Sequence, residues 1–199
     1  MSTQKRKYEK KARAESQRET RERIAGAAAE LHREVGVART TVAEIARRAG
    51  VQRLTVYNHF PDLSCLLPAC AAHYAERHPR PDLTRAFGHK VPADRVRAVL
   101  QAMYGWYGEN EAMLAGIQGD RGAVPELEEF CRQNSDRELA ELAAALAAGF
   151  GAQSHQGARV RALLALALDF WTWRRLDGEG LDTSAAAGLM AEAAASVNE

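Results

Sequence analysis

The sequence lacks the features that mark several large classes of protein. Its 199 residues include only three cysteines, Cys65, Cys70 and Cys131, and so small and odd a set fits reduced thiols better than a disulfide framework. The longest strongly apolar run, residues 162–168, is too short to cross a bilayer. The charged N-terminus has no apolar segment of the kind that secretory signals carry. We therefore expect a cytoplasmic protein with no membrane partner.

Signals for β-structure are equally scarce. The chain has no Asn-Gly turn and no long alternation of β-branched residues, and no proline follows Pro125. Alanine, the strongest helix former, supplies 39 residues. This composition predicts an all-α fold.

Short motifs of common catalytic or cofactor chemistry are missing, since the sequence has no HExxH, GxSxG, Walker A or GxGxxG pattern. Four possible zinc ligands, Cys65, Cys70, His73 and His78, lie close together in the sequence. On a helix of about 3.6 residues per turn these residues do not share one face, and structural zinc favours more closely spaced cysteine pairs on turns. We expect no enzyme activity, no cofactor and no metal site.

The near-neutral net charge of +1 hides an uneven distribution of charge. Residues 1–61 hold 14 Lys and Arg against 7 Asp and Glu, a local charge of +7. Residues 62–199 hold 13 against 19, a local charge of −6. A basic N-terminal region joined to an acidic remainder indicates that the first region meets a polyanion.

The first residues of the basic region offer almost nothing to bury. Residues 1–15 carry six lysines and arginines, which predicts a basic flexible tail. A capping-box pattern at Ser16-x-x-Glu19 predicts the start of the first folded helix, and Gly36 stands where that helix should end. We therefore place the first domain boundary between residues 15 and 16.

Two further short helices follow. A second capping box begins at Thr41 and opens a helix that Gly50 ends, and residues 52–60 form the next helix. Ala46, Gly50 and Val56 provide a small residue where two helices cross, a glycine that can leave the helix, and an apolar residue that fills the angle. This spacing is typical of a helix-turn-helix, so residues 16–62 are predicted to form a DNA-binding domain.

The second helix of this motif has a polar N-terminal face, formed by Gln52, Arg53 and Thr55, that is free to enter a major groove. Arg53 is the best candidate for bidentate contact with a guanine edge. Thr55, Tyr57 and His59 can donate to phosphates, as can the backbone N–H groups at the start of the preceding helix.

The run TVAEIARRAGVQRLTVYNHF, residues 41–60, resembles the N-terminal domain of the tetracycline-repressor (TetR) family of bacterial transcription regulators. The motif match covers about residues 20–67. Proteins of this family pair a three-helix DNA-binding head with a larger helical body that binds a small ligand and dimerises. The resemblance implies the same organisation here, with residues 63–199 as the ligand-binding and dimerisation domain.

The resemblance also assigns DNA contacts residue by residue. Two positions depart from the family pattern: Leu54 stands where many members have Gly or another small residue, and Leu63 stands where a phosphate-contacting lysine is usual. Loss of that lysine predicts a salt slope of DNA binding that is lower by about one unit per missing contact. The DNA-binding set that the resemblance implies is Thr41, Ala43, Gln52, Arg53, Leu54, Thr55, Tyr57 and His59.

The C-terminal part of the body supplies the expected subunit interface. The resemblance implies a homodimer through the last two long helices, here residues 158–176 and 182–197. The first of these segments is apolar nearly all round, which independently suggests a buried interface. Asp169, inside this segment, has two interpretations: an ion-pair partner across the interface, or a pocket charge for a cationic ligand.

The aromatic side chains of the body also have two interpretations, plain core or the lining of a ligand pocket. Tyr104 and Tyr107 share a predicted helix face with Leu100 and Met103, and neighbouring apolar residues are placed to close the same cavity. The candidate ligand-binding set is Leu100, Met103, Tyr104, Tyr107, Met113, Phe130, Phe170 and Trp173.

Together these features predict a ligand-responsive transcriptional regulator. In the leading hypothesis it is a repressor that binds a palindromic double-stranded DNA operator as a homodimer and is released by a small-molecule effector. The alternative hypothesis is a small-molecule binding protein with weakened or non-specific DNA binding, because of Leu54 and Leu63. A third is an activator or a ligand-independent regulator.

Overall fold

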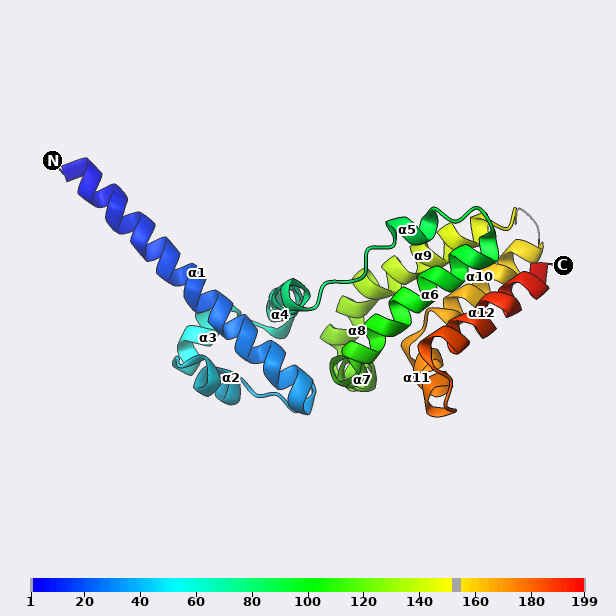
Figure 1. Cartoon of the computed structure of the whole chain (residues 1–199). Coiled ribbons are helices and arrows are strands. Elements are labelled where there is room, and N and C mark those ends of the chain that lie inside the picture. Colours follow the sequence, from blue (N-terminus) through cyan, green and yellow to red (C-terminus); the bar gives the residue numbers. More distant parts are fainter. Residues whose placement is uncertain (1, 152–154, 199) are drawn as a thin grey trace. The chain divides into compact units, whose positions relative to one another are not determined.

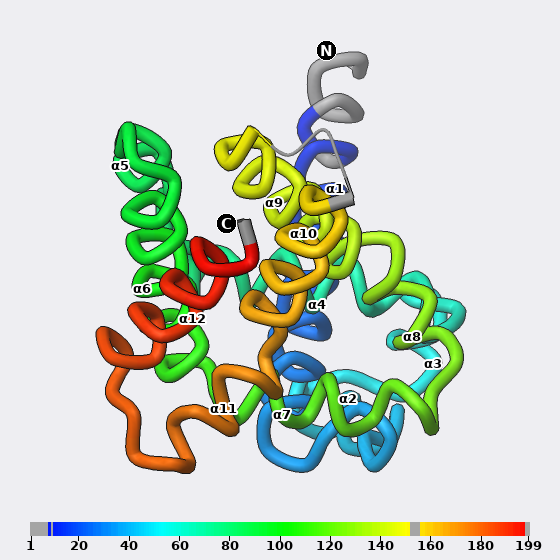
Figure 2. The backbone as a smooth tube through the Cα atoms, turned by 90° about the vertical axis from the view of Figure 1, so that its right-hand side faces the viewer, coloured from blue at the N-terminus to red at the C-terminus, as the bar shows by residue number. Residues whose placement is uncertain are grey.

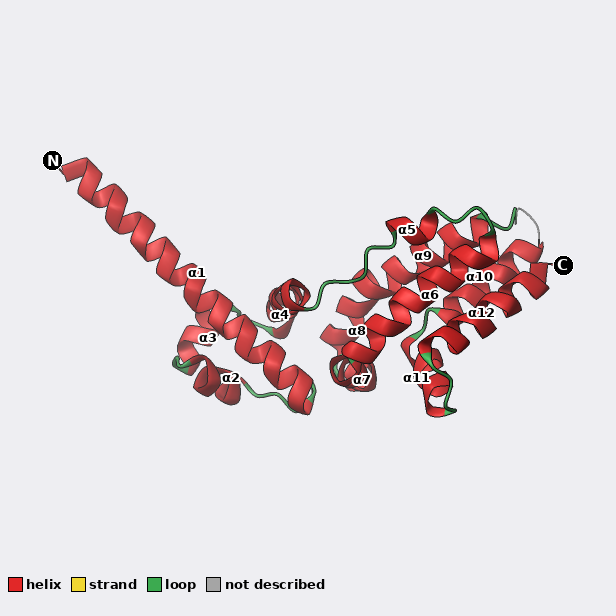
Figure 3. Cartoon of the chain, viewed as in Figure 1, coloured by secondary structure: helices red, strands yellow, loops and turns green. Residues whose placement is uncertain are grey.

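The computed structural model describes residues 2–151 and 155–198, and residues 1, 152–154 and 199 lie outside the described part. Every regular element of the described part is a helix (Figure 3), which confirms the predicted all-α fold. Two compact units are present, residues 1–79 with 115–130 and residues 80–114 with 131–199. The helices are α1 (Ser2–Val35), α2 (Val42–Ala49), α3 (Arg53–His59), α4 (Leu63–Arg77), α5 (Thr84–Phe87), α6 (Pro92–Glu109), α7 (Glu111–Asp120), η1 (Arg121–Ala123), α8 (Pro125–Cys131), η2 (Arg132–Asp136), α9 (Arg137–Ala148), α10 (His155–Ala167), α11 (Phe170–Gly178) and α12 (Thr183–Asn198).

The first unit is built on α1. Helices α2 and α4 pack against α1, and α3 packs against α2 (Figure 1). Small alanines on α1 let its neighbours approach closely, and larger aliphatic and aromatic side chains fill the remaining space. The buried core includes Ile24, Ala28, Leu31, Ile45, Ala46, Val56, Phe60 and Leu66.

Local signals in the sequence set the ends of the short helices in this unit. Thr41 caps α2 in the predicted capping box, and Gly50 ends it in the left-handed conformation with φ +66°. Gly36 follows α1 with φ +88°, a conformation that suits glycine because it has no Cβ. A Cβ at Gly36 would also meet the carboxylate of Asp120, and that carboxylate accepts a hydrogen bond from the Ala38 N–H at 3.0 Å. The predicted ends of these helices are confirmed.

The start of α1 differs from the prediction. The helix begins at Ser2 rather than at the Ser16 capping box, and the Ser16 carbonyl accepts a hydrogen bond from the Thr20 hydroxyl at 2.8 Å inside the helix. Lysine, arginine, glutamate and alanine are good helix formers, so this polar segment does not need a core in order to be helical. Arg18 adds ion pairs one turn away in both directions, to Glu15 and Glu22.

The second unit is a layer of packed helices. Helix α12 lies between α6 and α10 (Figure 2), and α9 packs against α10. The buried side chains come mainly from α6, α9, α10 and α12, as expected when each amphipathic helix turns its apolar stripe inward. The largest fully buried side chains of this unit are Tyr104, Leu100, Leu146, Leu164, Leu168, Val96, Val99 and Val160.

The prediction of one continuous helix over residues 158–176 is wrong. Helix α10 ends at Ala167 and α11 begins at Phe170. Between them Asp169 adopts an extended conformation and caps α11, accepting hydrogen bonds from the N–H groups of Trp171 and Thr172 at 2.8 and 3.1 Å. Asp169 therefore acts as a helix N-cap, and neither interpretation of this residue from the sequence included that role.

Candidate nucleic-acid interface

Helix α2 is held by its cap. The Thr41 hydroxyl oxygen accepts a hydrogen bond from the Glu44 N–H at 3.2 Å, and the Glu44 carboxylate accepts from the Thr41 N–H at 3.1 Å and from its hydroxyl at 2.7 Å. Hydrogen bonds from the Thr41 hydroxyl and then from its N–H hold the pKa of Glu44 below its usual range. The cap fixes the first turn of α2, so that its remaining N–H groups are presented in one direction.

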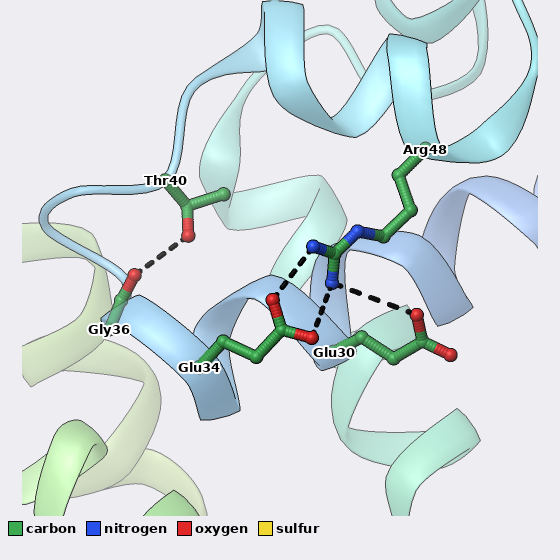
Figure 4. A network of polar contacts seen from close by, with 5 residues as sticks. All are labelled: Glu30, Glu34, Gly36, Thr40 and Arg48. Atoms are coloured by element: carbon green, nitrogen blue, oxygen red, sulfur yellow. Dashed lines mark hydrogen bonds and ion pairs between the residues drawn. The ribbon is translucent and has the colours of Figure 1, made fainter.

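An ion-pair network fixes α2 on α1 (Figure 4). The Arg48 guanidinium donates two hydrogen bonds of 2.7 Å to the Glu34 carboxylate and lies 3.8 Å from Glu30. Hydrogen bonding within this bidentate pair raises the pKa of Arg48 and lowers the pKa of Glu34. In the preceding loop, the Thr40 hydroxyl donates to the Gly36 carbonyl at 2.7 Å. Arg48 therefore serves the fold, although it is a cation within the helix-turn-helix.

Helix α3 presents a mixed polar and apolar face. Val56 is buried on the inner side and fixes the rotation of the helix. Gln52 precedes α3 as its N-cap residue, but its side chain makes no capping hydrogen bond. Arg53 is exposed, and so are Leu54 and Tyr57, with 67% and 50% of their surfaces accessible. The exposed leucine and tyrosine side chains gain no free energy from burial within the chain. A partner that covered them would supply that burial, so this face is suited to contact a partner.

Arg21 from α1 supports the end of α3. Its guanidinium donates to the His59 carbonyl at 2.7 Å and lies 4.0 Å from the centre of the Phe60 ring. Two residues further along α1, the Arg23 guanidinium donates to the Ala49 carbonyl at 3.2 Å. No local pattern in the sequence predicts either contact, because 38 and 26 residues separate the partners. Both arginines satisfy carbonyl groups at helix C-termini.

The predicted DNA-binding residues thus lie on one compact scaffold. Six of them belong to α3 or its cap, and two belong to α2 or its cap. Thr55, His59 and Ala43 are only partly exposed, whereas the others are exposed. The scaffold presents a short exposed helix with a cation, amide and hydroxyl groups, and an apolar side chain. Side chains of these kinds recognise base edges in a major groove.

Comparison with known proteins agrees with this geometry. A family model described as bacterial regulatory proteins, tetR family, matches residues 24–70, from the packed half of α1 into α4. The likeness to this family is therefore shown for the segment that contains the helix-turn-helix.

Two curated relatives match a short part of the chain. Uncharacterized HTH-type transcriptional regulators from two strains of Mycobacterium tuberculosis, CDC 1551 and H37Rv, are each 47% identical over 55 residues, which cover 27% of this chain and 29% of each relative. The chain therefore matches less than a third of the length of these curated relatives.

Solved structures match over most of the length of the chain. A TetR-like transcriptional regulator from Rhodococcus sp. RHA1 has a TM-score of 0.59 and 19% identity, and the match covers 88% of this chain and 93% of that one. A TetR transcription regulator from Haloarcula marismortui ATCC 43049 has a TM-score of 0.59 and 18% identity, with coverage of 90% and 96%. At these identities the likeness concerns the fold alone.

One departure from the tetR-family pattern has a structural explanation. Leu63 is half-buried and packs against the core of the first unit, so its side chain contributes to packing rather than to a charged surface. Asp62 caps α4 by accepting a hydrogen bond from the Cys65 N–H at 2.8 Å. The start of α4 thus has good capping but lacks a cation at residue 63.

The predicted ligand-binding residues are placed differently from the DNA-binding set. Seven of them are buried, and Phe130, which is half-buried, belongs to the first unit. The Tyr104 and Tyr107 hydroxyls donate to the carbonyls of Ala167 and Leu168 at 2.7 and 2.6 Å. Burial raises the pKa of both tyrosines. In this conformation both tyrosine hydroxyls are already hydrogen-bonded within the second unit.

Two pockets in the described part of the chain lie away from these residues. One, of about 1250 Å³, lies on the first unit and is lined mainly by α1 and α4. The other, of about 510 Å³, is lined by Arg97 of α6 and by α12 with the residue that precedes it. The eight predicted ligand-binding residues line neither pocket.

In the described part of the chain, no group of three or more His, Cys, Asp or Glu side chains is arranged to hold a metal ion. Of the possible ligands in α4, Cys70 is buried and Cys65 is exposed. No helix there has the length and hydropathy needed to cross a bilayer.

Proposed function

We propose that this chain is a ligand-responsive transcriptional repressor that binds a palindromic operator as a homodimer and is released by a small molecule. The observation that carries the proposal is the exposed face of α3, with Arg53 and Leu54 standing outward on a helix fixed by Val56 and Arg21. An exposed guanidinium beside an apolar side chain suits the adjacent edges of a guanine and a thymine. The match of residues 24–70 to the tetR family model supports the same function.

The homodimer is proposed to form through α10 and α12. Leu166 of α10 and Leu189 of α12 expose 54% and 47% of their surfaces, and Ala162 and Ala185, one turn before them, are exposed as well. Each of these two neighbouring helices thus exposes a small alanine one turn before a large leucine. In a two-fold symmetric dimer, the same surface of a second copy of the chain can cover these side chains. Such a dimer would place its two α3 helices on half-sites about one helical turn apart, or a multiple of that distance.

The response to a ligand is proposed to involve the aromatic core of the body. Tyr107 lies with its ring centre 5.9 Å from those of Phe170 and Trp173. A ligand that used these rings would have to separate them, and the free energy for this must come from tighter binding to the opened conformer than to the packed one. Release from DNA would follow when the opened conformer no longer matches the half-site spacing.

The test is a fluorescence anisotropy titration with duplex DNA from the region upstream of the chain's own gene, against a random duplex of equal length at the same salt concentration. We expect tighter binding to the upstream duplex, and a footprint with two related half-sites. Equal affinity for the two duplexes would remove the repressor proposal. It would favour the alternative, a small-molecule binding protein with weakened or non-specific DNA binding.

The dimer is tested by sedimentation of the unmodified chain and of Leu166→Glu and Leu189→Glu. Buried unpaired carboxylates are costly, so we expect each substitution to produce monomers and to abolish tight operator binding. Val91→Glu is the matched control, since it places the same charge on an exposed aliphatic side chain, 53% accessible, outside both the proposed dimer interface and α3. Monomers of the unmodified chain at the concentrations of the DNA titration would contradict the dimer.

A further inference from the structure

The two helices of the proposed subunit interface carry charges of opposite sign. Helix α10 contains two arginines and no acidic residue, whereas Glu192 is the only Asp, Glu, Lys or Arg of α12. Arg159 of α10 is exposed and makes no hydrogen bond or ion pair with the described residues. Glu192 lies 3.4 Å from Arg97 of α6, but its side chain is 73% accessible and so remains open to a second partner. Opposite charges therefore meet only where α10 of one subunit contacts α12 of the other.

The exposed side chains of the two helices follow the same spacing in opposite order. Along α10 an arginine is followed by an alanine after three residues and by a leucine after four more. Backward along α12 a glutamate is followed by a leucine after three residues and by an alanine after four more. Residues three and four apart share one face of a helix, and all six side chains are exposed. The α10 row is Arg159, Ala162 and Leu166, and the α12 row is Glu192, Leu189 and Ala185.

The two rows match when the helices that carry them are antiparallel. Within one subunit α10 and α12 run in opposite directions (Figure 2). A two-fold axis along the helices therefore sets α10 of one subunit antiparallel to α12 of its partner. Each position of one row then faces a complementary one: a cation faces a carboxylate, a small side chain faces a large one, and a large one faces a small one. Such alternation of size lets facing helices interdigitate.

Other alignments of the two rows lose this match. A shift by four residues sets Leu166 against the partner's Leu189 and leaves Arg159 without an acidic partner, and a shift by three in the other direction sets Leu166 against the partner's Asp182. In the parallel orientation Arg159 would face the partner's Asp182, but leucine would then face leucine and alanine would face alanine. Asp182 already accepts a hydrogen bond from a backbone N–H of α12 at 2.8 Å. The antiparallel alignment is therefore favoured by both size and charge.

We propose that α10 of each subunit packs antiparallel to α12 of its partner, and that an ion pair between Arg159 and the partner's Glu192 sets the register. This inference rests on the proposed homodimer and names the contacts within it. Two-fold symmetry forms the pair twice, once at each contact of α10 with α12. Burial of the leucines beside the pair supplies affinity, and the charges select the alignment.

The test exchanges the two charges between subunits. Arg159→Glu alone and Glu192→Arg alone each set like charges opposite one another at both contacts, so each should raise the dissociation constant of the dimer by about 100-fold. An equimolar mixture of the two variants should restore the dimer, because each contact of the mixed dimer again joins a cation to a carboxylate. Sedimentation equilibrium measures the association. Recovery in the mixture excludes a folding defect as the cause of the loss.

Arg161→Glu is the matched control, since it makes the same change at an exposed position of α10 outside the row. It should weaken the dimer far less, and Glu192→Arg should not compensate for it. If the two single variants dimerise as tightly as the unmodified chain, or if their mixture stays monomeric, the register is wrong while the homodimer stands. Compensation of Arg159→Glu by Asp182→Arg would establish the parallel orientation instead. If the unmodified chain is itself monomeric, the proposed homodimer has failed.

Discussion

The proposed DNA-binding surface of the first unit and the aromatic core of the second differ in how their polar groups are satisfied. On α3, Arg53 is exposed and makes no hydrogen bond with the described residues, and the Gln52 side chain makes no cap. In the body, the Tyr104 and Tyr107 hydroxyls donate to backbone carbonyls and their rings are buried. Both regions contain polar and aromatic side chains of the kinds that bind partners. Only in the first region are the polar groups of these side chains exposed and without hydrogen bonds to the described residues.

This difference indicates that the two regions meet their partners in different ways. A surface with unpaired donors can bind a partner without breaking internal contacts, so its binding is close to rigid docking. A packed core must first give up ring contacts and two hydrogen bonds, which cost free energy before any ligand contact is made. We therefore expect substitutions on α3 to change affinity for DNA and substitutions in the body core to change stability.

The largest expected effect belongs to Trp173 in the body core. Trp173 is 4% exposed and lies 5.5 Å from the Phe170 ring, measured between ring centres. Trp173→Ala should lower the free energy of unfolding by about 3–5 kcal/mol, because it removes buried apolar surface and leaves a cavity. The measurement is urea unfolding followed by circular dichroism.

Trp171→Ala is the control for this prediction, since the same change is made two residues away in α11. Trp171 is 45% exposed, so its truncation should cost far less than that of Trp173. Similar losses for the two variants would show that the aromatic cluster is not a closed core. The contrast between an exposed face on α3 and a packed aromatic core in the second unit would then be wrong.

The next effect concerns a buried polar group in the first unit. Burial lowers the pKa of His32 from 6.5 to about 4, and the carboxylate of Asp120 offsets part of that shift. Between these pH values the unfolded chain binds a proton that the folded chain does not, so stability is lost as the pH falls. The loss should approach about 3 kcal/mol from this residue alone by pH 4.

His32→Gln tests this prediction because it keeps a polar side chain that does not titrate. We expect unfolding measured at a series of pH values from 7 downward to show a steeper loss for the unmodified chain than for the variant. The difference should develop below the usual pKa of histidine, about 6.5, before most carboxylates titrate. Parallel curves would mean that His32 becomes protonated without disturbing the first unit.

How far the sequence predicts structure differs between the two regions for a physical reason. In the first unit the decisive interactions are local: the Thr41–Glu44 capping box and Gly50 act within a few residues, and both were predicted from spacing. The contact of Asp120 with Ala38 joins residues 82 apart, and no local pattern announces it. The exposed face of α3 followed from the motif, but the support that Arg21 gives to it did not.

The break between α10 and α11 shows why the body was harder to predict. Asp169 is an ordinary N-cap residue, but apolar residues stand on both sides of it, so hydrophobic periodicity continues through the break. From the sequence, this single Asp within an apolar run could be interpreted as an ion-pair partner or as a pocket charge. Its role as the N-cap of α11 explains its presence without either interpretation. Tyr104 and Tyr107 pack as core because their hydroxyls donate to the carbonyls of Ala167 and Leu168. These acceptors are far away in the sequence, so a local pattern does not predict whether the rings form core or line a pocket.

A smaller effect is expected for Arg53, and it is specific to DNA sequence. Arg53→Ala should weaken binding to the operator by roughly 1–3 kcal/mol, because a bidentate contact with guanine is lost. Binding to random DNA should change less, and the free energy of unfolding should stay within about 0.5 kcal/mol, as for other exposed side chains. Anisotropy titrations with both duplexes measure the effect. An equal loss on both would assign Arg53 to phosphates instead of bases.

The smallest effect tests whether Leu54, the least expected member of the interface, reads a base. Its side chain is 67% exposed beside Arg53, and apolar side chains at such positions contact the methyl group of thymine. Replacing the contacted thymine by uracil removes only that methyl group and should weaken binding by about 0.8 kcal/mol, the value of one buried carbon. Leu54→Ala should lose a similar amount on the thymine duplex and show little further loss on the uracil duplex. The two changes are expected to be non-additive because they remove the two sides of one contact. Additive losses would place Leu54 away from the base, as an exposed apolar side chain that the DNA does not cover.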